Sequence, residues 1–215
     1  MIKYPLIHST WDKDEFKAID KVAKTGMFTM GKNVSEFEKK FAKYQGKKYG
    51  VMVNSGSSAN LVSIASLFYK KKNPLKRGDE VIVPAVSWST TYSPLQQLGL
   101  KIKLVDIELD TFNINFEKLK KAVTKKTKLI VAVSLLGIPA ELQKMKKLCK
   151  EKKILFFEDN CESLGAEINK KKTGSFGDLA SHSFFFSHHI CTMEGGMVVT
   201  DDFELYCLMK VLRAH

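Results

Sequence analysis

The length and composition of the chain are those of a globular protein. Its 215 residues are 44% hydrophobic and 27% charged, which excludes an intrinsically disordered or fibrous protein. The 35 lysines and arginines against 23 acidic residues leave a net charge of +12, so acidic partners must be considered. The lysines lie in pairs and triplets along the whole chain and form no basic stripe with interleaved aromatics, so we expect no nucleic-acid binding.

The sequence also predicts the cellular compartment of the protein and whether it binds a metal ion. The N-terminal residues lack the apolar run of a signal peptide, and no stretch reaches the roughly 20 apolar residues of a membrane span. We therefore expect a cytoplasmic protein that binds no membrane. The four cysteines are widely separated and form no C-x-x-C pair, so we expect free thiols, no disulfide framework and no metal site.

Residues 1–45 are predicted to form an N-terminal helical arm. Asp12, with Glu15 three residues later, is typical of a capping box that begins a helix, and Gly26 is expected to end that helix. The spacing of apolar residues predicts a second helix from Val34 to Tyr44. Both helices precede the predicted sheet.

The remaining residues, 46–215, are predicted to form one α/β domain. Runs rich in valine and isoleucine alternate with amphipathic stretches, which is typical of a three-layer α/β/α fold with a mainly parallel sheet. Strands are expected at 49–53, 81–84, 102–105, 129–134, 154–158, 181–186 and 197–200, helices at 59–69, 116–123, 141–151 and 203–212, and a hairpin at 167–173. The sequence stops at or just past a helix without a terminating glycine or proline, so we expect a longer polypeptide; the alternative is a helix that frays at a natural terminus.

A turn of small residues joins the first strand to the following helix. It reads Asn54-Ser55-Gly56-Ser57-Ser58-Ala59-Asn60 and brings N–H groups and hydroxyls to the positive end of a helix dipole. Such a turn can hold a phosphate group. Small polar residues also make ordinary helix N-caps, so the turn alone leaves both interpretations open.

Two more motifs follow predicted strands at their carboxyl ends, where open α/β sheets bind ligands. Trp88 can stack on a planar ligand there, although a buried core tryptophan is the commoner role. Glu158 and Asp159 end another strand with side chains on opposite faces, so only one can face a ligand. That carboxylate can hold a proton on a ring nitrogen; a helix cap or a surface pair is the alternative.

The segment from Ser183 to Gly196 holds a paired histidine motif. Three phenylalanines precede His188 and His189, and a Gly-Gly turn follows. The side chains of adjacent histidines diverge, and no acidic or cysteine partner is suitably spaced, which argues against a metal site. The residues alone leave a proton-transfer role and a structural role equally open.

Taken together and in this order, the motifs resemble the sugar aminotransferase family of fold-type I pyridoxal phosphate (PLP) enzymes, from Trp11 to His215. The resemblance implies a PLP-binding large domain without its smaller C-terminal domain, and a homodimer. It also implies a set of cofactor-binding residues: Gly56, Ser57, Ser58 and Ser183 at the phosphate, Trp88 stacked on the pyridine ring, Asp159 at the ring nitrogen, and Glu162 where many members carry glutamine.

One position departs from this family pattern. The aminotransferases carry, six residues before the Glu-Gly-Gly turn, the lysine that binds the cofactor covalently; in this chain that residue is His188, and no lysine lies between Lys172 and Lys210. Imidazole forms no stable linkage with an aldehyde, so the resemblance implies the 3-dehydratase branch, which uses pyridoxamine phosphate (PMP) with His188 as base. The implied reaction removes the 3-hydroxyl of a nucleotide-diphosphate 4-keto-6-deoxy sugar for deoxysugar and O-antigen biosynthesis, with glutamate as amino donor.

Several alternatives stay open on the sequence alone. The chain can be a sugar aminotransferase in which another group replaces the lysine, or a truncated fragment without catalytic activity. A related branch of the family uses an iron–sulfur cluster and a partner reductase, and its cluster cysteines lie largely beyond the position that matches residue 215. The sequence does not assign a role to His189, and it does not identify the nucleotide or the sugar.

Overall fold

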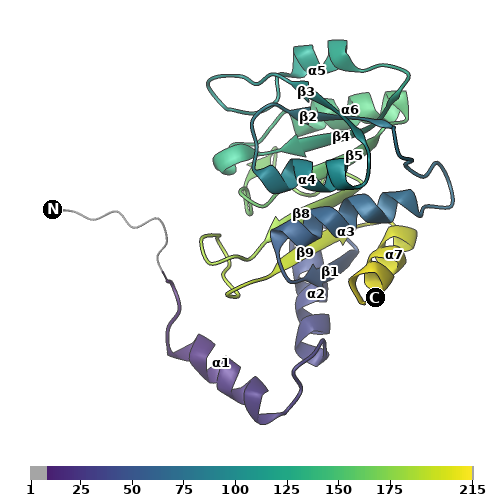
Figure 1. The fold of residues 1–215 in the computed structure, drawn as a ribbon. Coiled ribbons are helices and arrows are strands. Elements are labelled where there is room, and N and C mark those ends of the chain that lie inside the picture. Colours follow the sequence, from purple (N-terminus) through teal and green to yellow (C-terminus); the bar gives the residue numbers. More distant parts are fainter. Residues whose placement is uncertain (1–8, 215) are drawn as a thin grey trace.

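The structure is a computed structural model that describes residues 9–214. Figure 1 shows a central sheet with helices packed on it and one helix, α1, projecting from the rest. The helices are α1 (Lys13–Lys24), α2 (Lys32–Tyr44), α3 (Gly56–Phe68), α4 (Ser89–Gln97), α5 (Phe116–Ala122), α6 (Leu142–Lys152) and α7 (Phe203–Ala214), with a short 3-10 turn at Leu135–Gly137. Residues 1–8 of the predicted arm, and His215 at the end of the resemblance, lie outside the described residues.

The main sheet has seven strands in the order β1-β9-β8-β5-β4-β2-β3. They are β1 (Tyr49–Val53), β2 (Glu80–Pro84), β3 (Lys101–Val105), β4 (Thr127–Val133), β5 (Leu155–Asp159), β8 (Leu179–Ser183) and β9 (Gly196–Thr200). β9 is antiparallel to both of its neighbours, and the other pairs are parallel. The predicted mainly parallel α/β fold is confirmed, and β6 (Glu167–Ile168) with β7 (Lys171–Lys172) forms the expected hairpin.

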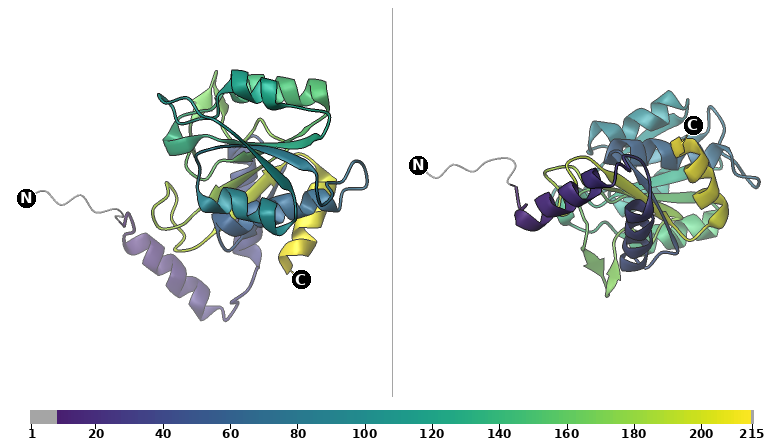
Figure 2. Two further views of the ribbon diagram at one scale, coloured as in Figure 1. Left: turned by 45° about the horizontal axis from the view of Figure 1, so that its top comes forward. Right: turned by 90° about the horizontal axis from the view of Figure 1, so that it is seen from below.

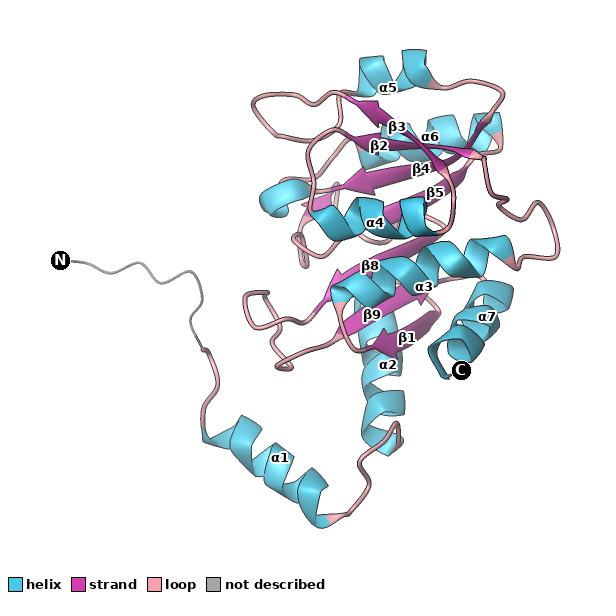
Figure 3. Cartoon of the chain, viewed as in Figure 1, coloured by secondary structure: helices cyan, strands magenta, loops and turns pink. Residues whose placement is uncertain are grey.

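Helices cover both faces of this sheet because both faces of its strands are apolar. Within β2, Val81 and Val83 enter a core with residues of α3, α4 and α7, whereas Ile82 enters a second core with residues of α5 and α6. The three layers can be followed in Figures 2 and 3. None of the described helices is long and apolar enough to cross a membrane.

The two N-terminal helices differ in how they pack. α1 begins with the predicted capping box, in which Asp12 accepts the N–H of Asp14 at 2.7 Å and Glu15 accepts the N–H of Asp12 at 2.8 Å. No residue of α1 is buried. α2 instead buries Phe41 and Ala42 against residues of β8 and β9. The division of the chain at residue 45 stays a prediction.

The largest differences from the sequence prediction are two element boundaries and one helix. α3 begins at Gly56 rather than at 59, and β8 ends at Ser183 rather than at 186. The whole of α4 was not predicted, because its sequence is rich in serine and threonine and contains Pro94. Proline has no N–H for the carbonyl of Thr90, four residues earlier, and Asn60 donates to that carbonyl instead at 3.1 Å.

Glu38 joins α2 to β1 and α7 through a buried ion pair. It accepts the N–H of Met52 at 2.9 Å and Nη1 of Arg213 at 2.5 Å, and the two side chains are 7% and 9% exposed. We expect Glu38→Gln to lower the free energy of unfolding by about 2 kcal/mol, because Arg213 then keeps its charge without a counter-charge. Urea unfolding measures this loss. The exposed Glu36 is the control: Glu36→Gln should cost less than about 0.5 kcal/mol, and equal losses would contradict the prediction.

Candidate functional site

The predicted site residues gather at one edge of the sheet. Asp159 is the last residue of β5 and Ser183 the last residue of β8, and these neighbouring strands are parallel. Gly196, the first residue of β9, pairs with Ser183 on one side and with Val53 of β1 on the other. The turn into α3 starts beside Gly196. Because parallel strands end at a common edge, this is where an α/β sheet binds ligands.

The turn into α3 is both a helix cap and a set of free donors. The Ser55 hydroxyl accepts the N–H of Ser58 at 3.1 Å, and the Ser55 carbonyl accepts that of Ala59 at 2.9 Å. The N–H groups of Gly56 and Ser57 have no protein acceptor within residues 9–214. Two free N–H groups at a helix N-terminus favour an anion. The two interpretations of this turn are therefore compatible.

Gly56 lets the turn approach the end of β8 closely. A Cβ atom at this position would lie 2.6 Å from Cβ of Ser183 and 3.0 Å from Sγ of Cys161. No side chain fits in that space. The close approach brings the Ser183 hydroxyl to the first turn of α3, as expected for two groups that bind one phosphate.

Asp159 is buried and receives hydrogen bonds from several elements. It is 6% exposed. Asn60 of α3 donates to its Oδ2 at 2.9 Å, and Thr91 of α4 donates to the same oxygen at 2.8 Å. The N–H of Cys161 reaches Oδ1 at 3.3 Å, and the Ser181 hydroxyl lies 3.5 Å from Oδ1. The bonds from Asn60, Thr91 and Cys161 hold the carboxylate in a fixed orientation.

Glu158 points to the opposite face, as the strand geometry predicts. Its carboxylate is 2% exposed and accepts the N–H groups of Gly174 and Phe176 at 2.7 Å each and that of Gly177 at 2.5 Å. Burial raises the pKa of Glu158, while these three donors and the nearby Lys47 oppose the rise. Glu158 therefore supports the β7–β8 connection and is separate from the Asp159 site.

His188 lies in the loop after β8, at the same edge as Asp159. The side chain is half-buried, and its ring centre is 6.4 Å from that of Phe185. Burial, and to a lesser extent His189, lower the pKa of His188, and the nearby carboxylates of Glu162 and Asp159 partly offset this effect. The imidazole is therefore neutral at pH 7 and able to accept a proton.

Glu162 and Trp88 are the two remaining predicted contacts of the ring. Oε2 of Glu162 accepts the N–H of Leu136 at 2.8 Å, which holds the carboxylate. Leu136 has a positive φ of 53°, an unusual conformation for leucine. Trp88 is 68% exposed at the start of α4, so it is not a core residue. Its stacking on a ligand stays a prediction.

The structure adds three residues that the sequence did not single out as Asp159 partners. These are Asn60, Thr91 and Ser181, which come from α3, α4 and β8. All three side chains are buried, but Asn60 and Thr91 each have a neighbour in the chain that is at least partly exposed, so the sequence offers no common signal for them. Their convergence depends on the strand order and on α4. Within residues 9–214, no group of three or more His, Cys, Asp and Glu side chains is placed to hold a metal ion.

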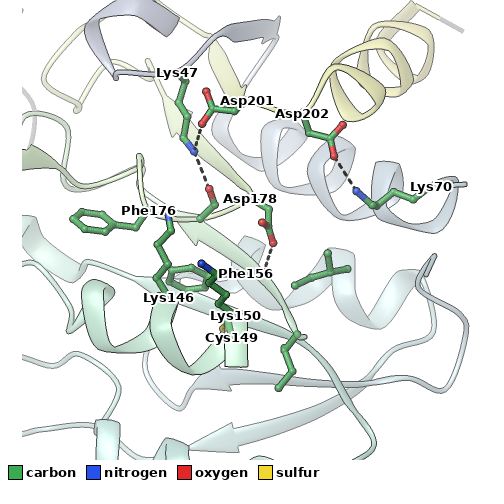
Figure 4. Close-up of a pocket in the computed structure, with 13 residues that line it drawn as sticks. Lys47, Lys70, Lys146, Cys149, Lys150, Phe156, Phe176, Asp178, Asp201 and Asp202 are labelled. Carbon is green, nitrogen blue, oxygen red and sulfur yellow. Dashed lines mark hydrogen bonds and ion pairs between the residues drawn. The ribbon is translucent and has the colours of Figure 1, made fainter. Parts of the chain in front are cut away.

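Two hollows lie away from Asp159 and His188. One, of about 370 Å³, opens at the amino ends of β5 and β8 (Figure 4). In it Lys47 pairs with Asp201 at 3.2 Å and Lys70 with Asp202 at 3.0 Å. The other, of about 560 Å³, lies between α3 and α7 beside Ser58. Neither of these two hollows is lined by Asp159 or His188, and the first is at the edge opposite to the one where α/β sheets bind ligands.

His182 is a buried histidine on the strand that carries the site. It is 1% exposed, its Nδ1 lies 3.4 Å from amide nitrogens of Gln45 and Asn160, and its Nε2 has no partner in the described part of the chain. Burial lowers the pKa of His182 from 6.5 to about 3. Between pH 6.5 and about pH 3, the His182 ring is therefore neutral in the folded chain and protonated in the unfolded chain.

This difference predicts acid sensitivity of the fold. The stability due to neutral His182 is complete above pH 6.5 and falls by about 1.4 kcal/mol per pH unit as the pH drops from 6.5 towards 3. Between pH 7 and pH 5 we expect a loss of about 2 kcal/mol from this residue, measured by urea unfolding at both values. His182→Asn should remove that part of the loss, whereas His189→Asn, an exposed control, should not. An unchanged pH dependence in His182→Asn would contradict the assignment.

Comparison with known proteins places these features in a family. The chain matches the DegT/DnrJ/EryC1/StrS aminotransferase family over residues 9–215. It is 56% identical to a GDP-4-keto-6-deoxy-D-mannose 3-dehydratase of Yersinia pseudotuberculosis, over 100% of this chain and 55% of that protein. The chain thus spans about half the length of the curated relatives it matches.

Solved structures agree with this comparison. The Escherichia coli GDP-4-keto-6-deoxy-D-mannose-3-dehydratase with bound hydrated PLP has a TM-score of 0.97 and 56% identity, over 100% of this chain and 55% of that one. A GDP-4-keto-6-deoxymannose-3-dehydratase with a trapped PLP-glutamate geminal diamine has a TM-score of 0.96 and 55% identity, over 99% and 55%. By fold, motif order and family match, the chain belongs to the DegT/DnrJ/EryC1/StrS aminotransferase family.

Proposed function

We propose that this chain is the cofactor-binding part of a PLP- and PMP-dependent 3-dehydratase that acts on a nucleotide-linked 4-keto-6-deoxy sugar. The observation that carries the proposal is His188, which occupies the place of the family's lysine at the edge that holds Asp159 and Glu162. The identity of 56% to 3-dehydratases for GDP-4-keto-6-deoxy-D-mannose supports a GDP-linked sugar as substrate. The PLP-glutamate adduct in a similar structure supports glutamate as amino donor.

The residues of the site fit a pyridine cofactor with a phosphate. The phosphate would be held by the free N–H groups of Gly56 and Ser57 and by the hydroxyls of Ser58 and Ser183. Gly56 allows this contact because it has no Cβ atom to keep the turn away from Ser183. Asp159 is buried, fixed and surrounded by donors, which suits a carboxylate that pairs with a protonated ring nitrogen.

Trp88 and Glu162 complete the proposed cofactor contacts. The exposed indole of Trp88 offers a flat face at the carboxyl edge of the sheet, as stacking on the ring requires. The N–H of Leu136 holds the Glu162 carboxylate, and this carboxylate lies near His188. We assign Glu162 a polar contact with the pyridine ring of the cofactor. The strands and loops that carry these residues end at the carboxyl edge of the sheet.

In the proposed reaction, His188 and Asp159 have different roles. When bound, the cofactor supplies an amino group that condenses with the keto-sugar and a ring that accepts an electron pair. His188 accepts a proton on its neutral imidazole, and it cannot hold the cofactor covalently as lysine would. Asp159 would hold a proton on the ring nitrogen, and a positive charge there is what would favour departure of the 3-hydroxyl.

The overall reaction balances. The sugar loses the oxygen of its 3-hydroxyl and becomes a 3-deoxy-4-keto sugar. Glutamate is oxidised to 2-oxoglutarate and releases ammonia, and it provides the two electrons that the sugar gains. Water takes part in the individual steps, but none is consumed overall.

Two further properties belong to the proposal. We assign a homodimer, because the projecting α1 exposes Phe16, Ile19 and Val22 and offers an apolar surface to a second copy. We assign a cytoplasmic location, because the four cysteines are free and suit a reducing compartment. Sedimentation velocity at several protein concentrations tests the dimer.

The proposed reaction can be tested by product analysis. The protein is incubated with PLP, glutamate and GDP-4-keto-6-deoxymannose in heavy-oxygen water, and the sugar is followed by mass spectrometry together with the absorbance of the cofactor. Loss of the 3-hydroxyl with release of ammonia would support the 3-dehydratase. An aminated sugar would identify an aminotransferase instead, and cofactor binding without any change in the sugar would identify a fragment that binds PLP but does not turn over.

A further inference from the structure

Asn60 uses both N–H donors of its amide group and accepts one hydrogen bond on its amide oxygen, and the residue is 1% exposed. Its Nδ2 donates to Oδ2 of Asp159 at 2.9 Å and to the carbonyl of Thr90 at 3.1 Å. Its Oδ1 accepts the hydroxyl of Ser181 at 2.6 Å. A flipped amide would place an oxygen against the Asp159 carboxylate and the Thr90 carbonyl. The contacts therefore determine the orientation of the amide.

The two carboxylate oxygens of Asp159 accept different sets of hydrogen bonds. Oδ2 accepts from both Asn60 and Thr91, and these two bonds use both of its lone pairs. Ser181 has a single hydroxyl proton. That proton goes to Asn60 at 2.6 Å rather than to Oδ1 of Asp159 at 3.5 Å. Oδ1 therefore keeps accepting capacity, with the N–H of Cys161 at 3.3 Å as its protein donor.

The position of Asn60 also depends on Pro94. Because proline has no N–H, the carbonyl of Thr90 is free of the usual helical bond and accepts the second proton of the Asn60 amide. Through this amide α3 is joined to α4, to β5 by Asp159 and to β8 by Ser181. One buried side chain thus links the elements that surround the carboxylate.

We propose that Asn60 is the positioning residue for Asp159: it saturates Oδ2 and withdraws the Ser181 proton, so that Oδ1 is the oxygen that receives a ring N–H donor. This inference rests on the proposed function, since the donor is the pyridine ring of the cofactor. Asn60 itself does not touch the cofactor. Its effect is exerted through Asp159.

The test compares the binding and the protonation of ring-labelled PLP in variants. For the native chain we expect the nitrogen-15 NMR signal of bound PLP at the position of a protonated ring. Asn60→Leu, close in volume but without hydrogen bonds, should move the signal towards the unprotonated position at the same pH and raise the Kd of PLP about tenfold. Thr91→Val, an isosteric change at the second Oδ2 donor, should shift the signal in the same direction and serves if Asn60→Leu does not fold. Asn33→Leu, the same substitution on the exposed side of α2, should change neither quantity.

The possible outcomes distinguish a failure of this inference from a failure of the proposed function. If the native chain binds PLP and Asn60→Leu leaves both the signal and the Kd unchanged, Asn60 does not position Asp159. A higher Kd with an unchanged nitrogen signal would show a merely structural role and would also overturn the inference. If the native chain binds no PLP, the proposed function fails, and the inference fails with it.

Discussion

His188→Asn is expected to slow loss of the sugar's 3-hydroxyl by about 10² to 10⁴-fold, the usual contribution of a general base. Asparagine is similar in size but cannot accept a proton at neutral pH, whereas the imidazole of His188 can, because burial lowers its pKa. The rate is measured as 3-deoxy product by mass spectrometry at saturating substrate. PLP should still bind, since the proposed phosphate and ring contacts come from other residues.

His189→Asn is the matched control, because His189 is exposed and adjacent. We expect this variant to keep most of the native rate. Equal losses in the two variants would show that the loop as a whole matters rather than the base at His188. The pH profile gives a second check: the acid limb of the native rate should lie below pH 6.5, the value for free imidazole, since the pKa of His188 is lowered.

Gly196→Ala is expected to lower the free energy of unfolding by at least about 3 kcal/mol and to abolish PLP binding. A Cβ atom at Gly196 would overlap the carbonyl of Ser55 and lie 2.9 Å from N of Gly56. These are backbone atoms of the turn that begins α3, so they cannot move without displacing the proposed phosphate site. Urea unfolding and titration with PLP measure the two effects.

The neighbouring Gly195 provides a control of the same chemistry. A Cβ atom there would meet the hydroxyl end of Thr192, an exposed side chain that can rotate, and Phe184 at 3.4 Å. We therefore expect Gly195→Ala to cost less than about 1.5 kcal/mol and to preserve PLP binding. If both variants behave alike, the close approach of the turn to β9 is not what requires glycine at 196.

Local patterns in the sequence were sufficient for most of the elements. Alternation of apolar and amphipathic stretches depends on neighbouring residues, so the strands from β1 to β9 and the helices α5, α6 and α7 were predicted within a few residues. The capping box at Asp12 and the opposite directions of Glu158 and Asp159 follow from local geometry and are confirmed. α4 was missed because its stability comes from packing and from Asn60, and neither appears in its own sequence.

The sequence by itself determined the fold class, the order of the motifs and the absence of lysine at His188, because each is a property of residue type and spacing along the chain. Only the tertiary structure decided that Asn60, Thr91 and Ser181 converge on Asp159, because they come from three elements that meet through strand order. It also decided that Glu158 is structural and that Trp88 is exposed. Contacts between residues distant in sequence depend on packing, which no local pattern contains.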